Sequence, residues 1–409
     1  MVEIAGIPFP FILFALTLLG VALFHHHTLA VALTGLTAIV SFGLLTGQLD
    51  LVAHLGHEWV VLANLFGLLL GFALLADHFH QSGMPDLLPK FLPDGYWGAF
   101  SLLILIFVLS SFLDNIAAAM IGGTVAATVF RGRVHPGYLA AIVAASNAGG
   151  SGSVIGDTTT TMMWIDGVRP GDVFHAYVGA VVAVLVVAII ASAQQTRFAP
   201  ILADPVDAPP LDWKRLGIVA FVMTTAVVTN FVLNTRFREW ADSFPFIGAA
   251  VLLTVGLCSV IRAPNWSLLP ATVKGSLFLL SLVLSASLMP VSALPAASWQ
   301  STMTLGFVSA VFDNIPLTKL ALTQGGYDWG MLAYSVGYGG SMVWFGSSAG
   351  VAISNIYPGV KSVGTWLRHG WHVTLAFILG FMALQLGLGF HPHAPHKAAP
   401  AAVHEAARP

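Results

Sequence analysis

Three aspartates, Asp114, Asp157 and Asp313, lie in stretches that are otherwise strongly apolar. A charged side chain at the centre of a lipid bilayer costs about 2.5 kcal/mol or more, so such residues usually face a partner, a cavity or an ion. Asn115 and Asn314 directly follow two of these aspartates. Carboxylate and amide oxygens together are suited to coordinating a small cation such as sodium. The spacing therefore indicates ion coordination as the chemistry of these residues.

Further oxygen atoms for an ion lie close to the aspartates in the sequence. We expect the ion or substrate site to comprise Ser110, Asp114, Asn115, Asn147, Ser151, Asp157, Thr158, Ser309, Asp313, Asn314, Ser341 and Ser347. The sodium ligands expected among them are Asp114, Asn115, Asp157, Asp313 and Asn314. The structural alternative is that each aspartate caps the helix that follows it, and this role is compatible with ion binding.

A glycine-rich stretch, 147–161, separates two apolar half-helices. It holds four glycines within eight residues, and each costs a helix about 1 kcal/mol relative to alanine. Unwound backbone at membrane depth must line a cavity or bind something, because hydrocarbon offers no hydrogen-bond partners. We therefore expect a broken helix over about 138–166.

The composition is that of an integral membrane protein. The chain has 409 residues, of which 57% are hydrophobic and 8% are charged, whereas a soluble domain has roughly 25% charged residues. A formal net charge of −2 argues against nucleic acid as a partner, so membrane lipid is the expected surrounding. The single cysteine and the lack of Cys–His spacing give no sign of a structural zinc site. No cofactor is expected.

Hydropathy predicts an all-α polytopic membrane protein built from two halves, 1–195 and 214–390, joined by a cytoplasmic linker at 196–213. The first half has expected spans at about 7–24, 28–46, 59–77 and 173–194, a re-entrant hairpin at about 96–131 and the broken helix at 138–166. The second half has expected spans at about 215–233, 245–261, 273–290 and 365–390, a hairpin at about 298–324 and a broken helix at about 330–356. A Pro-, Ala- and His-rich tail, 391–409, is expected to be disordered.

The two halves repeat the same motifs in the same order. Ser-Ser-Phe-Leu-Asp-Asn-Ile at 110–116 matches Ser-Ala-Val-Phe-Asp-Asn-Ile at 309–315, and Gly-Gly-Ser at 149–151 matches Gly-Gly-Ser at 339–341. The place of Asp157 is taken by Ser347, so the two breaks are not equivalent. Five crossings in each half would invert the second half relative to the first. With both termini outside, basic residues fall about two to one on the cytoplasmic side of a cell inner membrane.

Several charged residues have more than one interpretation. Lys319 could pair with another carboxylate, snorkel to the interface or attract an anion. Asp77 and His78 form either an ordinary interfacial pair or a proton relay. The clustered histidines could bind metal, but polar loops explain them better: they are His25, His26 and His27 near the start, and His391, His393, His396 and His404 in the tail.

At these motifs the chain resembles the ion-transporter superfamily, most closely its D-type bacterial sodium/proton antiporters, with the citrate and arsenite carriers as cousins. The resemblance rests on Ser-Phe-Leu-Asp-Asn at 111–115, Asn-Ala-Gly-Gly at 147–150, Gly-Asp-Thr-Thr-Thr at 156–160, Asp-Asn-Ile-Pro at 313–316 and Gly-Ser-Ser-Ala-Gly at 346–350. It implies a homodimer in which a scaffold lies beside a moving domain that carries the hairpins and broken helices. The dicarboxylate branch has Ser-Asn-Thr at its hairpin tips, whereas Asp-Asn here favours a cation.

These observations leave three hypotheses for function. The leading one is a secondary active transporter, not an enzyme, that exchanges Na⁺ or Li⁺ for protons. The alternative is a proton- or sodium-coupled carrier of an organic anion such as citrate or of an oxyanion such as arsenite. An intramembrane aspartyl protease would need two carboxylates facing each other across the scissile bond, and an asparagine beside each hairpin-tip aspartate suits ion coordination better.

Overall fold

The structure is a computed structural model, and it describes residues 2–4, 6–24, 27–201, 210–237 and 239–393. Apart from a short antiparallel ribbon of β1 (Glu3–Ile4) and β2 (Ile7–Pro8), the regular elements of these ranges are all helices. The all-helical class expected from the sequence is confirmed.

The first half of the described chain holds ten α-helices and one short 3₁₀ helix. Their bounds are α1 (Phe9–Leu23), α2 (Thr28–Leu45), α3 (Leu51–His80), α4 (Met84–Leu87), η1 (Leu88–Phe91), α5 (Gly95–Ser110), α6 (Asn115–Val129), α7 (Pro136–Ser151), α8 (Thr158–Ile165), α9 (Pro170–Phe174) and α10 (Ala176–Phe198).

The second half has the same order of elements, with shorter helices in the hairpin and in the first part of the break. Its elements are α11 (Trp213–Arg236), α12 (Phe246–Cys258), η2 (Trp266–Leu268), α13 (Leu269–Ser287), η3 (Val291–Ala293), α14 (Trp299–Ser309), α15 (Asn314–Gln324), α16 (Trp329–Gly339), α17 (Ser348–Ile356), η4 (Pro358–Val360), α18 (Val363–His369) and α19 (Trp371–Gly387).

Five helical segments of the described chain are long and apolar enough to cross a bilayer. They are Thr28–Leu45, Leu51–His80, Pro170–Phe198, Trp213–Leu233 and Trp266–Ser287. The pair α18 and α19, bent by 62°, would make a sixth. By length and composition these helices identify a multi-pass membrane protein. The inverted orientation of the second half and the re-entrant course of the hairpins stay predictions.

Three predicted spans are shorter than expected or divided in the structure. The spans expected at 7–24 and 245–261 are helices of only 15 and 13 residues, α1 and α12. The span expected at 365–390 is divided at Gly370, where a Cβ atom would lie 2.9 Å from the Cβ of Ala140 on α7. This close approach of the backbone to α7 explains why a glycine stands at the bend.

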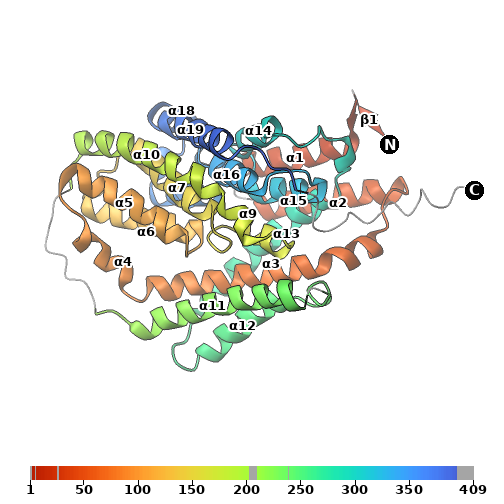
Figure 1. Cartoon of the computed structure of the whole chain (residues 1–409), viewed down its shortest axis with the longest axis horizontal. Coiled ribbons are helices and arrows are strands. Elements are labelled where there is room, and N and C mark those ends of the chain that lie inside the picture. The colour runs from red at the N-terminus through yellow and green to blue at the C-terminus, as the bar shows by residue number, and fades with distance from the viewer. Residues whose placement is uncertain (1, 5, 25–26, 202–209, 238, 394–409) are drawn as a thin grey trace, which may run out of the picture.

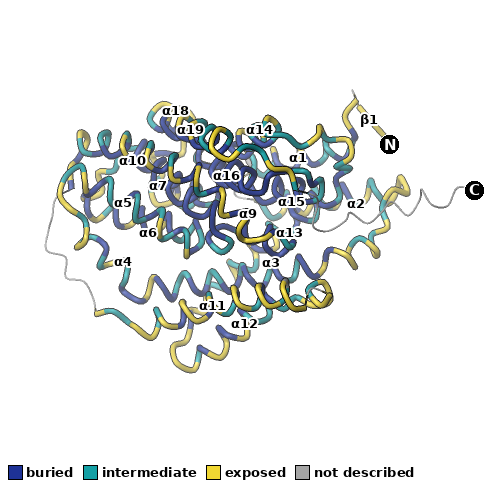
Figure 2. The backbone as a smooth tube through the Cα atoms, viewed as in Figure 1, coloured by how far each residue is buried: buried dark blue, intermediate teal, exposed yellow. Residues whose placement is uncertain are grey.

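The two broken helices lie at the centre of the molecule. Every residue of α16 is buried, and so is every residue of α7 except Pro136 at its start. Helix α7 packs against α5, α6, α10 and α16, while α10 packs against α19. Helices α11 and α12 lie along α3 at the edge of the molecule and expose many apolar side chains (Figures 1 and 2). The first parts of the two broken helices, α7 and α16, are therefore enclosed by protein along nearly their whole length.

Glycines allow each hairpin to press against its broken helix. A Cβ atom on Gly149 of α7 would lie 2.1 Å from the carbonyl oxygen of Phe107 on α5. The matching residue of the second half, Gly339, has the same clearance of 2.1 Å to the carbonyl oxygen of Gly306 on α14. Real Cβ atoms do not approach so closely, so the two helices of each half meet backbone to backbone.

Replacing Gly149 by alanine is expected to lower stability by about 1–3 kcal/mol, because the carbonyl of Phe107 must be pushed away. The measurement is the apparent unfolding temperature in detergent. The control is Gly217→Ala on α11, where a Cβ atom meets nothing within 4 Å and alanine favours the helix. Equal unfolding temperatures for the two variants would contradict the packing argument.

Candidate functional site

Both helix breaks fold back on themselves in the same way. Helix α7 ends at Ser151 and α8 begins at Thr158, and a Cβ atom on Gly150 would lie 2.7 Å from the carbonyl oxygen of Gly156. In the second half the corresponding distance, from Gly340 to the carbonyl oxygen of Gly346, is 2.8 Å. The tight backbone contact places the residue after each loop, an aspartate or a serine, at the start of the second half-helix.

Asp157 and Ser347 cap these second half-helices. The Asp157 Oδ1 atom accepts a hydrogen bond from the Thr159 amide at 3.1 Å. The Ser347 hydroxyl accepts one from the Gly350 amide at 3.2 Å. The breaks thus have matching backbone geometry but different charge.

The hairpin-tip aspartates are also caps. Asp114 Oδ1 accepts a hydrogen bond from the Ile116 amide at 2.8 Å, and Asp313 Oδ1 accepts one from the Ile315 amide at 3.0 Å. The capping role considered from the sequence is therefore real for both. The cap bonds engage one oxygen, Oδ1, of each carboxylate, so capping and ion binding are compatible here.

Asparagine amides connect each hairpin tip to a helix break. The Asn115 amide donates to Asn147 Oδ1 at 3.0 Å, and the Asn147 amide donates to the hydroxyls of Ser341 and Ser347 at 2.9 and 3.1 Å. Asn147 therefore joins the first hairpin tip to the break of the second half, about 200 residues away in sequence.

The second hairpin tip contacts the opposite break. The Asn314 amide donates to Asp157 Oδ2 at 3.5 Å, across 157 residues of chain. Asp313 directly precedes Asn314, and Asp114 lines the same cavity as Asp157, described below. Carboxylates and an amide from both halves thus lie around this helix break, although the sequence places them far apart.

Three serine hydroxyls of the predicted site donate hydrogen bonds to backbone carbonyls of the same helix or of a neighbouring one. Ser110 donates to the carbonyl oxygen of Ser146 at 2.6 Å and Ser309 donates to that of Val336 at 2.7 Å, which ties each hairpin to its broken helix. Ser151 donates to the Ala148 carbonyl at 2.8 Å. Their role as ion ligands stays a prediction.

A cavity of about 540 Å³ lies between α3, α6, α8 and α13. Asp114, Asp157 and Thr158 line one part of it, and Asp77 and His80 line another. Most of the remaining lining is apolar. Because His80 is exposed, the cavity joins two of the three aspartates to the surface at the end of α3. Asp313 is not part of its lining.

Three known proteins with sequences similar to this chain are all named as sodium/proton antiporters. The chain is 27% identical over 287 residues to sodium/proton antiporter 1 of Arabidopsis thaliana, covering 60% of this chain and 48% of the relative. It is 26% identical over 293 residues to sodium/proton antiporter 2 of the same plant, with coverages of 60% and 66%. It is 25% identical over 337 residues to the Na⁺/H⁺ antiporter NhaD of Halomonas elongata, with coverages of 68% and 65%.

The chain is thus similar in sequence to sodium/proton antiporters. The resemblance to D-type antiporters seen in the motifs is thereby confirmed. The match spans about half to two thirds of the length of these relatives. No protein-family model matches the chain.

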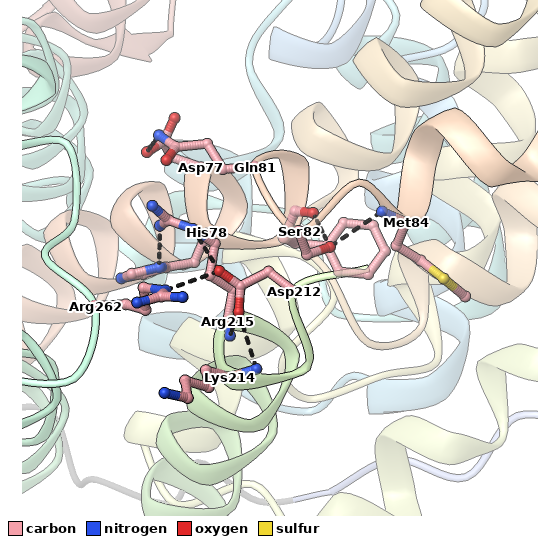
Figure 3. Close-up of polar contacts among 10 residues, drawn as sticks. Asp77, His78, Gln81, Ser82, Met84, Asp212, Lys214, Arg215 and Arg262 are labelled. Carbon is pink, nitrogen blue, oxygen red and sulfur yellow. Dashed lines mark hydrogen bonds and ion pairs between the residues drawn. The ribbon is translucent and has the colours of Figure 1, made fainter. Parts of the chain in front are cut away.

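At the end of α3, where the cavity reaches the surface, Asp77 and His78 do not pair with each other. Asp77 accepts a hydrogen bond from Gln81 at 2.5 Å, and His78 Nδ1 lies 2.9 Å from Nη1 of Arg215 on α11. An arginine can only donate, so His78 Nδ1 is the acceptor and its ring is neutral in this contact. The interfacial pair expected from the sequence is thus replaced by two separate contacts (Figure 3).

Asp212 ties this region together. Its carboxylate caps α11 by accepting from the amides of Lys214 and Arg215 at 3.0 and 3.2 Å, and it accepts from Arg262 Nε at 2.8 Å (Figure 3). The hydrogen bond from Arg262 is the main reason that the pKa of the Asp212 carboxyl lies below its usual range. The carboxylate therefore keeps its charge, and with it these contacts, until the pH falls through this depressed pKa.

Replacing Asp212 by asparagine is expected to lower the apparent unfolding temperature at pH 7 by about 1–2 °C, because asparagine keeps the cap but loses the charge. A carboxyl with a depressed folded-state pKa stabilises the fold above its unfolded value of about 3.9, and this contribution disappears as acid protonates the folded carboxyl. The difference between the variant and the parent should therefore shrink as the pH falls below the unfolded value and through the depressed pKa. Asp94→Asn is the control, since Asp94 makes no side-chain cap bond to α5. A difference that stays constant or grows as the pH falls would contradict the argument.

Lys319 pairs with a carboxylate, which decides among its three interpretations. Its Nζ atom lies 2.8 Å from Oε2 of Glu58, and both residues are buried. Sequence reasoning missed Glu58 because the span was placed at 59–77, one residue beyond it. Helix α3 in fact begins at Leu51, after the cap provided by Asp50, whose side chain accepts from the Ala53 amide. That aspartate before an apolar run was the signal available in the sequence.

The described histidines of the predicted clusters make backbone contacts or lie exposed. His27 is exposed, whereas His25, His26, His396 and His404 lie outside the described residues. The amide of His391 donates to Asp328 Oδ2 at 3.0 Å, and that of His393 donates to the Tyr327 carbonyl at 3.0 Å. The start of the predicted disordered tail is thus held to α16, and 394–409 lie outside the described residues. Within the described ranges, no three metal-binding side chains gather into a group.

Proposed function

We propose that this chain exchanges a monovalent cation, Na⁺ or Li⁺, for protons across a membrane. The observation that carries the proposal is the contact of Asn314, at the hairpin tip of one half, with Asp157 at the break of the other, where Asp157 and Asp114 line one cavity. Like charges in a protected site repel one another, and either a bound cation or bound protons relieve the repulsion. A site that accepts one or the other, but not both together, couples their movements in opposite directions.

The proposed sodium ligands are oxygens of Asp114, Asn115, Asp157, Asp313 and Asn314. The side-chain amides of Asn115 and Asn314 donate hydrogen bonds to Asn147 and Asp157, respectively. Their side-chain carbonyl oxygens therefore remain available to coordinate a cation. The cavity supports this assignment because it reaches Asp114 and Asp157 from the surface.

The proposed layout places the halves 1–195 and 214–390 in opposite orientations around a cytoplasmic linker, 196–213, with both termini outside a cell inner membrane. The matching contacts of Gly149 and Gly339, and of Ser110 and Ser309, support the internal repeat. A homodimer with a scaffold and a moving domain is part of the same proposal.

The test is proton movement in proteoliposomes that contain a trapped pH-sensitive dye. Addition of Na⁺ or Li⁺ should release protons from the lumen in the sense of exchange, while K⁺ at equal concentration should not. Empty liposomes are the control for leakage. Absence of any cation-driven proton movement would overturn the proposal.

The alternative, an organic-anion or oxyanion carrier, loses one of its supports. Lys319, the basic residue that could have attracted an anion, is neutralised by Glu58 at 2.8 Å. Parallel liposome assays with citrate and arsenite separate the two functions, since uptake of either anion without sodium/proton exchange would favour the carrier.

A further inference from the structure

A buried ion pair joins α3 to α15. Lys319 Nζ donates to Glu58 Oε1 at 3.0 Å and lies 2.8 Å from Oε2, and the two side chains are only 6% and 9% exposed. Burying both charges is costly, and a pair of apolar side chains in the same volume is often equally stable or more so. Fold stability alone is therefore a weak reason for this pair.

The pair lies outside the cavity, beyond its lining along α3. On α3 the described lining of the cavity runs from Leu65 to His80, and Glu58 precedes it by about 10 Å of helix. Helix α15 contributes none of the described lining, yet it begins with Asn314, which contacts Asp157. One end of α3 thus borders an open path, while the other end is fastened to the helix that completes the site.

A second polar contact lies beside the pair. His54, one turn before Glu58, places Nε2 2.9 Å from the hydroxyl of Ser287 on α13. Helix α13 packs against both α3 and α15. The three helices therefore meet in a small polar cluster at this end, within otherwise apolar surroundings.

We propose that the Glu58–Lys319 pair is a latch that closes the ion site on the side away from the cavity and separates once in each transport cycle. The inference rests on the proposed exchange function, because a carrier must expose its site to the two sides in turn. A buried ion pair is either formed or broken, so it favours one of two arrangements of α15 against α3. Without the latch, the population should shift away from the arrangement in which the cavity is open.

The experiment measures how fast a cysteine in the cavity is labelled. Cys258, the only cysteine of the chain, is replaced by serine, and Gly275→Cys supplies the reporter. Gly275 lines the cavity and a Cβ atom there meets nothing within 4 Å. The latch is removed with both partners neutralised, as Glu58→Gln with Lys319→Met, since a single change would leave a lone buried charge. Labelling by a water-soluble maleimide in nanodiscs should slow by about threefold or more, as the open-cavity population falls.

Two further variants test whether charge pairing is responsible. Exchanging the charges, as Glu58→Lys with Lys319→Glu, should restore the labelling rate of the parent reporter chain. Ser287→Ala removes the neighbouring contact but not the pair, and it should label at the parent rate. An unchanged rate in the neutral double variant overturns the latch, and so does a folded charge-exchanged variant that labels as slowly as the neutral one.

The labelling result is independent of ion flux, so the two proposals fail separately. A parent chain that moves no protons on addition of sodium overturns the exchange function. A parent chain that exchanges ions, together with unchanged labelling in the neutral variant, overturns the latch alone.

Discussion

Replacing Asp157 by asparagine is expected to abolish sodium-driven proton movement and to weaken sodium binding by about a thousandfold. Two unit charges about 4 Å apart attract by about 4 kcal/mol at an effective dielectric constant of 20, and this attraction disappears with the carboxylate. The proton carried by Asp157 in the opposite direction is lost at the same time. The measurement is the dye-reported proton flux in proteoliposomes, with sodium binding followed by isothermal titration.

The fold should survive this change because asparagine keeps the helix cap. It caps helices as well as aspartate does, so its carbonyl oxygen keeps the bond from the Thr159 amide. The contact from the Asn314 amide is lost, because Asp157 accepts it through its second oxygen and that atom becomes an NH2 donor in asparagine. Asp86→Asn on α4 is the matched control, since Asp86 is exposed and outside the cavity lining. Unchanged proton flux in the Asp157 variant would show that this aspartate only caps its helix and does not bind the ion.

Asp114 gives a second, independent test of the same site. It lines the cavity together with Asp157 and caps α6 through the Ile116 amide. Asp114→Asn is therefore expected to abolish exchange and to leave the protein folded and inserted, as judged by a single monodisperse peak in detergent. Full activity in this variant would remove Asp114 from the proposed ligands.

Apparent sodium affinity is expected to weaken as the medium becomes more acidic. A sodium ion and a proton compete for the same carboxylates, so each bound proton must leave before sodium enters. In the limit of full competition, affinity falls about tenfold for each pH unit below the pKa of the site. Isothermal titration with sodium between pH 6 and pH 9 measures this dependence.

The anion-carrier alternative predicts the opposite trend. Protonation would neutralise the aspartates and leave anion binding unchanged or improved at low pH. A flat sodium profile, or tighter sodium binding in acid, would therefore contradict exchange and favour the carrier. Asp86→Asn again serves as control, since a remote carboxylate should not alter the slope.

The ends of the helices at the hairpins and breaks were predictable because the residues that start or stop these helices lie next to them in the sequence. Asp-Asn at 114–115 and at 313–314 falls at the observed helix starts, since an aspartate followed by a helix-forming segment is a capping signal. Glycines at 149–156 mark the end of α7 for a similar reason, because they cannot hold a regular helix and allow the close backbone contacts found there.

The partners across the site were not predictable, because they depend on packing between distant segments. Lys319 and Glu58 are 261 residues apart, and His78 and Arg215 are 137 apart. Hydropathy shows that a charged residue lies in an apolar helix. It does not show which neighbouring helix carries the partner of that charge. The bend at Gly370 was missed for the same reason, since it is set by the approach to Ala140.

The backbone contacts of Gly149 and Gly339 have a consequence for engineering this protein. Because each hairpin and its broken helix meet without intervening side chains, neither surface can be altered independently of the other. A chimera that takes α5 and α6 from a relative while keeping α7 and α8 would combine two backbones that were never fitted together. Grafts that alter ion preference should therefore transplant 95–165 or 299–356 as whole cassettes, with the boundaries placed in the loops outside them.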